Sequence, residues 1–238
     1  MAYFKKYFGL YLTVCGIIIA VALFLSRAGS AVVALSTQVD TAPIVVIDAG
    51  HGGEDGGALS CTGVRESDVN LDISLRMHDL LHFMGIQTKM IRTTDISIYT
   101  EGASTLSEKK VSDLHNRVEI VNDTPNALLV SIHQNRFPQS KYRGAQVFYA
   151  ATHGSDALAQ LTQDNLKAQV DPKNNREIKK TPDVYLFKHV QCTAILIECG
   201  FLSNEAEEAL LRTPEYQKKL TAAICCSVQQ YLEASNEG

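Results

Sequence analysis

The feature that most limits the fold is a set of short apolar runs, each closed by a polar residue. They predict strands at Ile44–Asp48, Ala127–His133 and Ala194–Glu198. Runs that stay apolar along their whole length, instead of alternating, are typical of parallel strands buried on both faces. Ligands of such sheets bind outside the carboxyl ends of the strands. The sequence therefore predicts a parallel sheet with its functional site at that edge.

Helical periodicity fills the stretches between these strands. From Asp68 to Met84 apolar residues recur every three or four positions, and Gly85 is suited to end the helix. Further helices are expected after capping or helix-starting residues. These residues are Thr105 or Ser107, Ser155, Asn204 and Pro214. Residues 169–183 are polar and contain two prolines, so we expect a long loop. The alternation predicts an α/β fold, a three-layer sandwich with helices flanking a mostly parallel central sheet.

The chain of 238 residues fits one domain and an N-terminal extension. We expect a signal-anchor or signal peptide in residues 1–30, a tether in residues 31–42 and a catalytic domain in residues 43–235. Lys5 and Lys6 precede an uncharged stretch that is longer than the usual signal-peptide core of about 7–15 residues. This length favours an uncleaved anchor, although small residues nearby would also permit cleavage. Either outcome predicts export, as a membrane-anchored or secreted protein.

Composition excludes several classes of partner. The net charge of −4 gives no reason to expect nucleic-acid binding. The glycine-rich loop Gly52–Gly57 lacks the Lys and Ser or Thr of a phosphate-binding loop, which argues against a nucleotide. None of the six cysteines forms a Cys-x-x-Cys pair, so we expect free thiols and no cysteine metal site.

Two histidines and two glutamates are the candidates for chemistry. His51 lies in the loop after the first strand, His133 and Glu198 end two later strands, and Glu66 lies just ahead of a helix. Two histidines and one carboxylate on zinc leave a fourth position for water, as in catalytic sites. The other carboxylate would be the general base. This predicts a zinc hydrolase with one Zn²⁺ per chain. The alternatives without a metal are that His51 is a turn residue, that Glu66 is a solvated loop residue or caps a helix, and that His133 and Glu198 are buried core residues.

Four segments in order resemble the signature blocks of the zinc-dependent N-acetylmuramoyl-L-alanine amidases. They are Asp48–Ala58, Gly63–Glu66, Ser131–Asn135 and Glu198–Asn204. The resemblance implies that His51, Glu66 and His133 bind zinc and that Glu198 is catalytic. It also implies cleavage of the amide between the lactyl group of N-acetylmuramic acid and L-alanine in peptidoglycan.

Two further residues are expected to contact the substrate. Asn135 lies two positions beyond His133 and would share its side of the strand. Arg176, in the basic loop, could meet a substrate carboxylate, although a solvated loop face is an equal alternative. Asp48, Glu54 and Asp55 are all candidates to orient His51, because ligating histidines usually donate their other N–H to an oxygen.

The single-domain layout behind a hydrophobic N-terminus is similar to that of germination-specific amidases of the spore cortex. This likeness implies a role in making muramic δ-lactam, with a polysaccharide deacetylase acting downstream and a possible lipoprotein activator. The protein would then lie in the forespore intermembrane space. The alternatives are another zinc peptidase of similar fold, such as a carboxypeptidase, and a non-catalytic wall-binding regulator.

One histidine pair imitates a metal motif. His78 and His82 have the i, i+4 spacing of a helical zinc site, but Asp79 stands where that motif has Glu. Both histidines lie opposite the main apolar stripe of their helix. We therefore interpret them as surface residues.

Overall fold

The computed structural model describes residues 19, 21 and 42–236. The chain divides into two units, Met1–Thr41 and Ala42–Gly238. The predicted anchor or signal peptide and nearly all of the tether lie outside the described residues, so these boundaries stay predictions. In the part of the chain that is described, no helix is long and apolar enough to cross a bilayer.

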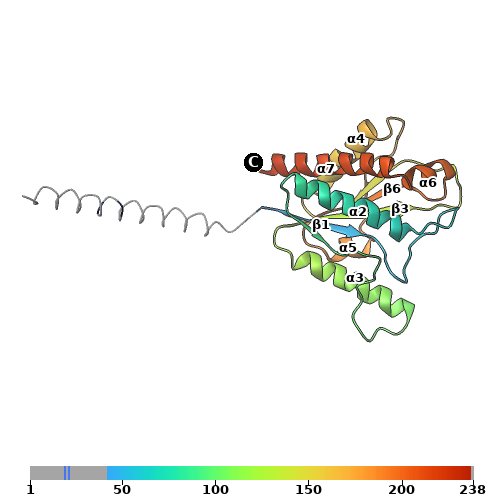
Figure 1. The fold of residues 1–238 in the computed structure, drawn as a ribbon, viewed down its shortest axis with the longest axis horizontal. Helices are drawn as coiled ribbons and strands as arrows, with labels where there is room; N and C mark the ends of the chain where they lie inside the picture. Colours follow the sequence, from blue (N-terminus) through green and yellow to red (C-terminus); the bar gives the residue numbers. More distant parts are fainter. Residues whose placement is uncertain (1–18, 20, 22–41, 237–238) are drawn as a thin grey trace, which may run out of the picture. The chain divides into compact units, whose positions relative to one another are not determined.

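A six-stranded sheet forms the centre of the second unit, in the order β2-β1-β3-β6-β4-β5 (Figure 1). Neighbouring strands in the run from β2 to β6 are parallel, β4 is antiparallel to β6, and β5 is parallel to β4. The strands are β1 Ile44–Ala49, β2 Thr88–Met90, β3 Ala127–Asn135, β4 Gln146–Tyr149, β5 Lys179–Lys180 and β6 Thr193–Phe201. The predicted α/β fold with a mostly parallel sheet is confirmed.

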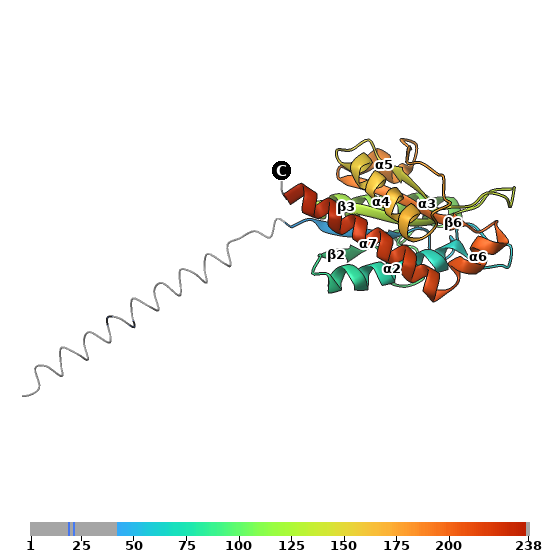
Figure 2. The same ribbon diagram turned by 90° about the horizontal axis from the view of Figure 1, so that it is seen from above.

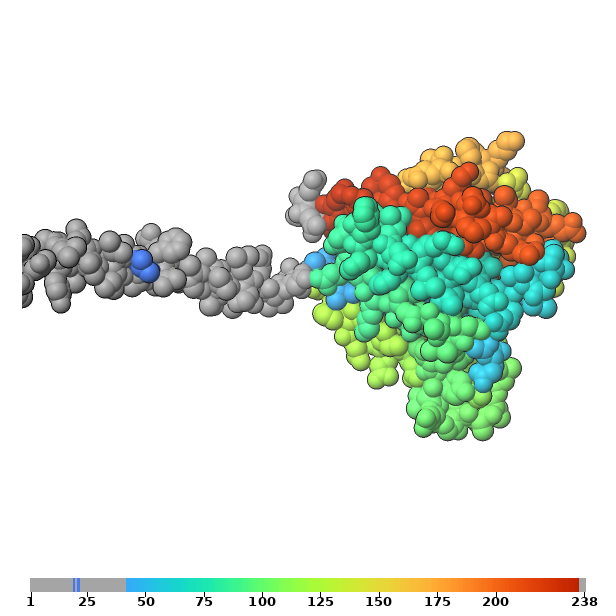
Figure 3. Space-filling model, viewed as in Figure 1, coloured from blue at the N-terminus to red at the C-terminus, as the bar shows by residue number. Residues whose placement is uncertain are grey.

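Helices cover both faces of this sheet. They are α2 Glu66–Phe83, α3 Leu106–Asn122, α4 Ser155–Gln169, α5 Tyr185–His189, α6 Glu205–Leu211 and α7 Pro214–Asn236. Helix α7 packs against α2 and α4 on one face, and the other face carries α3 and α5 (Figure 1). In the space-filling view α2 and α7 lie side by side and form much of the visible surface (Figure 3).

The central strands are apolar throughout because both of their faces are buried. Val45 and Ile47 of β1 join the core beneath α2, α4 and α7, whereas Val46 joins the core beneath α3 and α5. All three side chains are fully buried. This packing explains why these strands show no alternation in the sequence.

Several local predictions are refined by the structure. Thr105 caps α3 in a reciprocal capping box with Glu108, and Asn204 caps α6, as predicted. Ser155 does not cap α4; Gly154 takes that position, and the Ser155 hydroxyl accepts a hydrogen bond from the backbone of Ala194 in β6. The predicted loop of residues 169–183 contains the short strand β5, and helix α5 was not predicted at all.

Candidate metal centre

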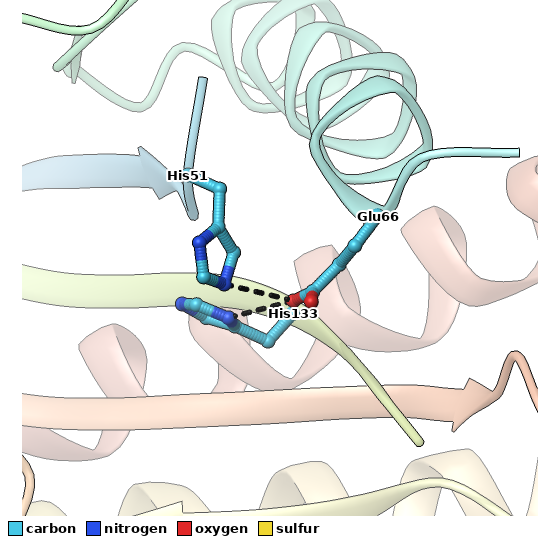
Figure 4. Close-up of side chains that lie close together, drawn as sticks. All are labelled: His51, Glu66 and His133. Carbon is cyan, nitrogen blue, oxygen red and sulfur yellow. Dashed lines mark hydrogen bonds and ion pairs between the residues drawn. The ribbon is translucent and has the colours of Figure 1, made fainter. Parts of the chain in front are cut away.

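Three side chains converge at the carboxyl ends of β1 and β3 (Figure 4). His51 lies in the loop, two residues after β1. His133 belongs to β3, and Glu66 begins helix α2, two residues earlier than predicted. Oε1 of Glu66 lies 2.9 Å from Nδ1 of His133 and 3.4 Å from Nε2 of His51. Within residues 42–236 this is the only cluster of His, Cys, Asp or Glu whose ligand atoms all lie within 4.8 Å of one another.

Charge and hydrogen bonding hold the cluster in a state suited to a cation. Burial opposes ionisation of Glu66, but hydrogen bonds with His133 and His51 outweigh it and keep the pKa of Glu66 well below its usual range. Burial likewise opposes the charged form of His51, yet hydrogen bonds to Asp55 and Glu66 raise its pKa to about 9. A metal cation would displace the proton that these groups share, so metal affinity should increase with pH.

The loop after β1 brings its backbone close to the ligand side chains. His51 adopts a left-handed conformation with φ of 62°. A Cβ atom on Gly50 would lie 2.3 Å from the ring of His133, and one on Gly57 would lie 2.7 Å from both Glu66 and His51. The two imidazoles and the carboxylate therefore pack directly against the backbone at Gly50 and Gly57, where a larger residue would clash with them. This close fit of ligand-type groups meets the requirement of a preformed metal site.

Two buried arginines bind the backbone carbonyl groups of the same loop. Arg92 donates to the carbonyl oxygens of Ala49 and Gly50 at 2.8 and 3.1 Å, and Arg117 donates to that of His51 at 2.9 Å. Each arginine has only 2% of its surface exposed. Sequence reasoning missed both, because an arginine after a strand or within a helix carries no local sign that it will be buried.

One of the three residues expected to orient His51 does so. Asp55 Oδ2 lies 3.0 Å from Nδ1 of His51, which leaves Nε2 of the ring for a metal. Asp48 instead accepts hydrogen bonds from Arg117 and from the Ser131 hydroxyl. Glu54 pairs at the surface with Lys109 at 2.7 Å. The expectation was therefore right for Asp55 and wrong for the other two.

Glu198 lies beside the cluster without belonging to it. In the β3–β6 pairing it stands directly opposite His133. Its Oε2 atom is buried and has no hydrogen-bond partner. Burial raises the pKa of Glu198 to about 7, against the opposing effect of His133. A carboxyl group with this pKa and a free oxygen can accept and release a proton near neutral pH.

The structure also shows where the predicted substrate-contact residues and the histidine pair of α2 lie. Strand β3 continues through Asn135, but an irregularity after His133 pairs Asn135 with Phe201. Arg176 is half-buried near Glu198, and the assignment of both residues to the substrate stays a prediction. His82 is exposed, as predicted, whereas His78 is half-buried and hydrogen-bonded to the hydroxyl of Thr88.

The α/β fold and the cluster of His51, Glu66 and His133 together are typical of a hydrolase with a metal site. Comparison makes this specific: the family model for N-acetylmuramoyl-L-alanine amidase matches residues 45–230. The chain belongs to this family.

Individual relatives agree with this assignment. A germination-specific N-acetylmuramoyl-L-alanine amidase of Bacillus subtilis is 36% identical over 189 residues, which are 79% of each protein. The CwlD amidase of Clostridioides difficile, solved in complex with the GerS lipoprotein, is 42% identical; the match covers 81% of this chain and 99% of that one, with a TM-score of 0.78. An N-acetylmuramoyl-L-alanine amidase from Clostridium difficile 630 is 32% identical, with 82% and 98% covered and a TM-score of 0.72.

The packing of Gly50 on His133 yields a prediction. Gly50→Ala should displace the imidazole and weaken zinc binding by about 10- to 100-fold, the range typical for altered support of metal ligands. Titration of zinc against a competing chelator would measure this. Gly56→Ala is the matched control, because its Cβ would meet only the flexible side chain of Arg65. Equal zinc affinity in the two variants would contradict the prediction.

Proposed function

We propose that His51, Glu66 and His133 hold one Zn²⁺ ion and that Glu198 is the general base. The donor set supports zinc, because two imidazoles and a carboxylate are its usual catalytic ligands. A bound zinc ion supplies a Lewis acid that acidifies water and polarises a carbonyl group. The single observation that carries the proposal is Glu198, a buried carboxyl group without a structural partner next to three converging ligands.

In this mechanism Asp55 and Glu198 have different roles. Asp55 accepts the Nδ1 proton of His51 and so fixes the ring with Nε2 toward the ligand cluster. Glu198 takes a proton from water and passes it to the nitrogen of the leaving amine. Its enclosure raises the pKa enough for both steps to occur near neutrality.

The substrate we propose is peptidoglycan, with cleavage of the amide that links the lactyl group of N-acetylmuramic acid to L-alanine. Similarity to the germination-specific amidase supports a role in the spore cortex. Amide cleavage there would prepare muramic acid for δ-lactam formation, with a polysaccharide deacetylase as the next enzyme. We also propose that the protein is exported and held at a membrane by residues 1–30, between the two forespore membranes.

A lipoprotein partner forms part of this proposal. The CwlD amidase of Clostridioides difficile was solved in complex with the GerS lipoprotein, and this chain matches nearly all of that amidase. We propose that a lipoprotein of similar type binds this amidase at the membrane.

The deciding experiment is digestion of purified peptidoglycan, with zinc supplied or removed by a chelator, followed by mass spectrometry of the products. An amidase releases peptides that begin with L-alanine and leaves glycan without peptide. Release of a terminal amino acid would instead identify a carboxypeptidase. Binding without any cleavage in the presence of zinc would identify a regulator of the cell wall.

The ligand assignment predicts the behaviour of histidine variants. His51→Ala and His133→Ala should each lose bound zinc and activity, because each removes one of three protein ligands. Elemental analysis and peptidoglycan digestion measure the two properties. His78→Ala and His82→Ala are the matched controls and should change neither. Full zinc occupancy in the first pair would refute the assignment.

The proposed base predicts a different result for Glu198→Gln. This variant should keep its zinc, since Glu198 lies outside the ligand cluster, and should lose about 10²–10⁴-fold in kcat. Zinc content and turnover must be determined on the same sample. Turnover close to that of the natural protein would remove Glu198 from the mechanism.

The pKa of Glu198 also predicts the pH dependence of activity. A general base acts when ionised, so activity should decrease as the pH falls through its pKa. Burial raises the pKa of Glu198 to about 7, and a nearby cation would draw it down, so the acid limb of kcat/KM should have its midpoint at or below pH 7. The measurement needs saturating zinc, so that metal loss does not imitate the titration. A limb that persists unchanged in Glu198→Gln would contradict this origin.

A further inference from the structure

A row of side chains crosses the sheet at the proposed site. Strands β3, β6 and β4 are neighbours, and the pairing sets His133 opposite Glu198 and Glu198 opposite Gln146. Residues directly opposite on paired strands project from the same face. With strands about 4.8 Å apart, the row runs from a ligand residue through the proposed base to an amide in even steps.

Arg176 extends this row by one more group. Its Nη1 donates to Oε1 of Gln146 at 2.7 Å, and its Nε donates to the carbonyl oxygen of Arg143 at 2.8 Å. The guanidinium also lies over the ring of Phe201, with 4.5 Å between its central carbon and the ring centroid. Three contacts therefore fix a side chain that would otherwise be mobile. Among residues 42–236 no group accepts a hydrogen bond from Nη2, so the N–H groups of this one nitrogen are free.

Apart from Glu198, which interacts with it electrostatically, the carboxylates near Arg176 are engaged elsewhere. Asp171 pairs with Arg143 at 2.8 Å, and Glu177 pairs with Lys167 at 2.6 Å. Glu207 accepts the backbone N–H groups of Gly144 and Phe201. Among residues 42–236, the guanidinium of Arg176 is thus held in place without a hydrogen bond or ion pair to a carboxylate.

The surroundings favour an anionic ligand. Residues 136–144, which join β3 to β4, contain three cationic residues and no acidic one, although the whole chain has a net charge of −4. This yellow-green loop projects beyond the ends of the strands (Figure 2). It also exposes Phe137 and Tyr142, whose rings lie 5.2 Å apart. A peptide that carries carboxylates would match this charge.

The direction of the row indicates which part of a substrate reaches Arg176. In amide hydrolysis the C–N bond breaks, the acyl carbon gains the oxygen of water, and the nitrogen gains a proton. The acyl group must lie at the ligand cluster, and the leaving nitrogen must lie near the group that protonates it, Glu198. The released peptide therefore extends from Glu198 across Gln146 toward Arg176.

We propose that Arg176 binds the carboxylate of the glutamate that follows L-alanine in the peptidoglycan peptide. Guanidinium groups form charge-assisted hydrogen bonds with carboxylates, and the free Nη2 of Arg176 can donate to one. Arg176 is then a residue that determines substrate specificity on the leaving-group side. The proposal rests on the amidase activity proposed above.

The test compares two muropeptides that differ only at this glutamate, one with the free carboxylate and one with the corresponding amide. The natural protein should cleave the carboxylate form with a kcat/KM about 10- to 100-fold higher, as expected for a charge-assisted hydrogen bond. Arg176→Gln should lose this preference, and Arg176→Lys should keep part of it. Lys173→Gln removes an exposed charge from the same segment and should leave the preference intact.

The ratio between the two substrates is the informative quantity, since partial loss of folded protein lowers both rates equally. Retention of the full preference in Arg176→Gln, or equal cleavage of both substrates by the natural protein, would overturn the role of Arg176 and leave the amidase activity standing. Failure of the natural protein to cleave either muropeptide would overturn the proposed function itself.

Discussion

The site depends on how three backbone carbonyl groups are satisfied where the chain leaves β1. At the last residue of the strand and the two that follow it, Ala49, Gly50 and His51, the carbonyl oxygens accept hydrogen bonds from the buried guanidinium groups of Arg92 and Arg117. Two cations inside a protein need counter-charges, and Asp48 and Asp113 pair with Arg117. Loss of one partner from such a buried pair typically costs about 3–5 kcal/mol, because the remaining charge stays unpaired. The strained conformation of His51 is thus maintained by a network that spans β1, β3 and α3.

The two glutamates show how the surroundings of one residue type can assign opposite roles. Glu66 receives hydrogen bonds from two imidazoles and from the backbone N–H groups of Ala58 and Gln134, all of which favour its charged form. Glu198 is enclosed beside the same imidazoles but has an oxygen with no partner. Divergent pKa values of this kind separate a group that stays ionised from one that exchanges protons. The roles implied by family resemblance therefore agree with the electrostatics of each carboxylate.

Much of this architecture could be predicted from the sequence, because the signals are local. Apolar runs indicated β1, β3 and β6. His51 after β1, His133 in β3 and Glu66 at the start of α2 then form the predicted cluster. The rest depends on contacts between distant segments. Arg117 reaches Asp48 across 69 positions, and Ser155 turns away from its helix to bond β6, so neither role has a local pattern. For the same reason β5, which exists only through its pairing with β4, looked like loop.

The shortness of β2 and β5 limits how far a second copy could extend the sheet at its edges. The two outer strands of the sheet, β2 and β5, contain three and two residues, and each carries lysine. A long uncharged outer strand would offer its free backbone groups to another copy, which is a common start of aggregation. At β2 and β5 a second copy would find few backbone N–H and C=O groups to pair with. Its own edge lysines would also lie against those of the first copy. The long apolar strands that build the site are all interior, so the sheet can be rich in β-branched residues and still resist growth at its edges.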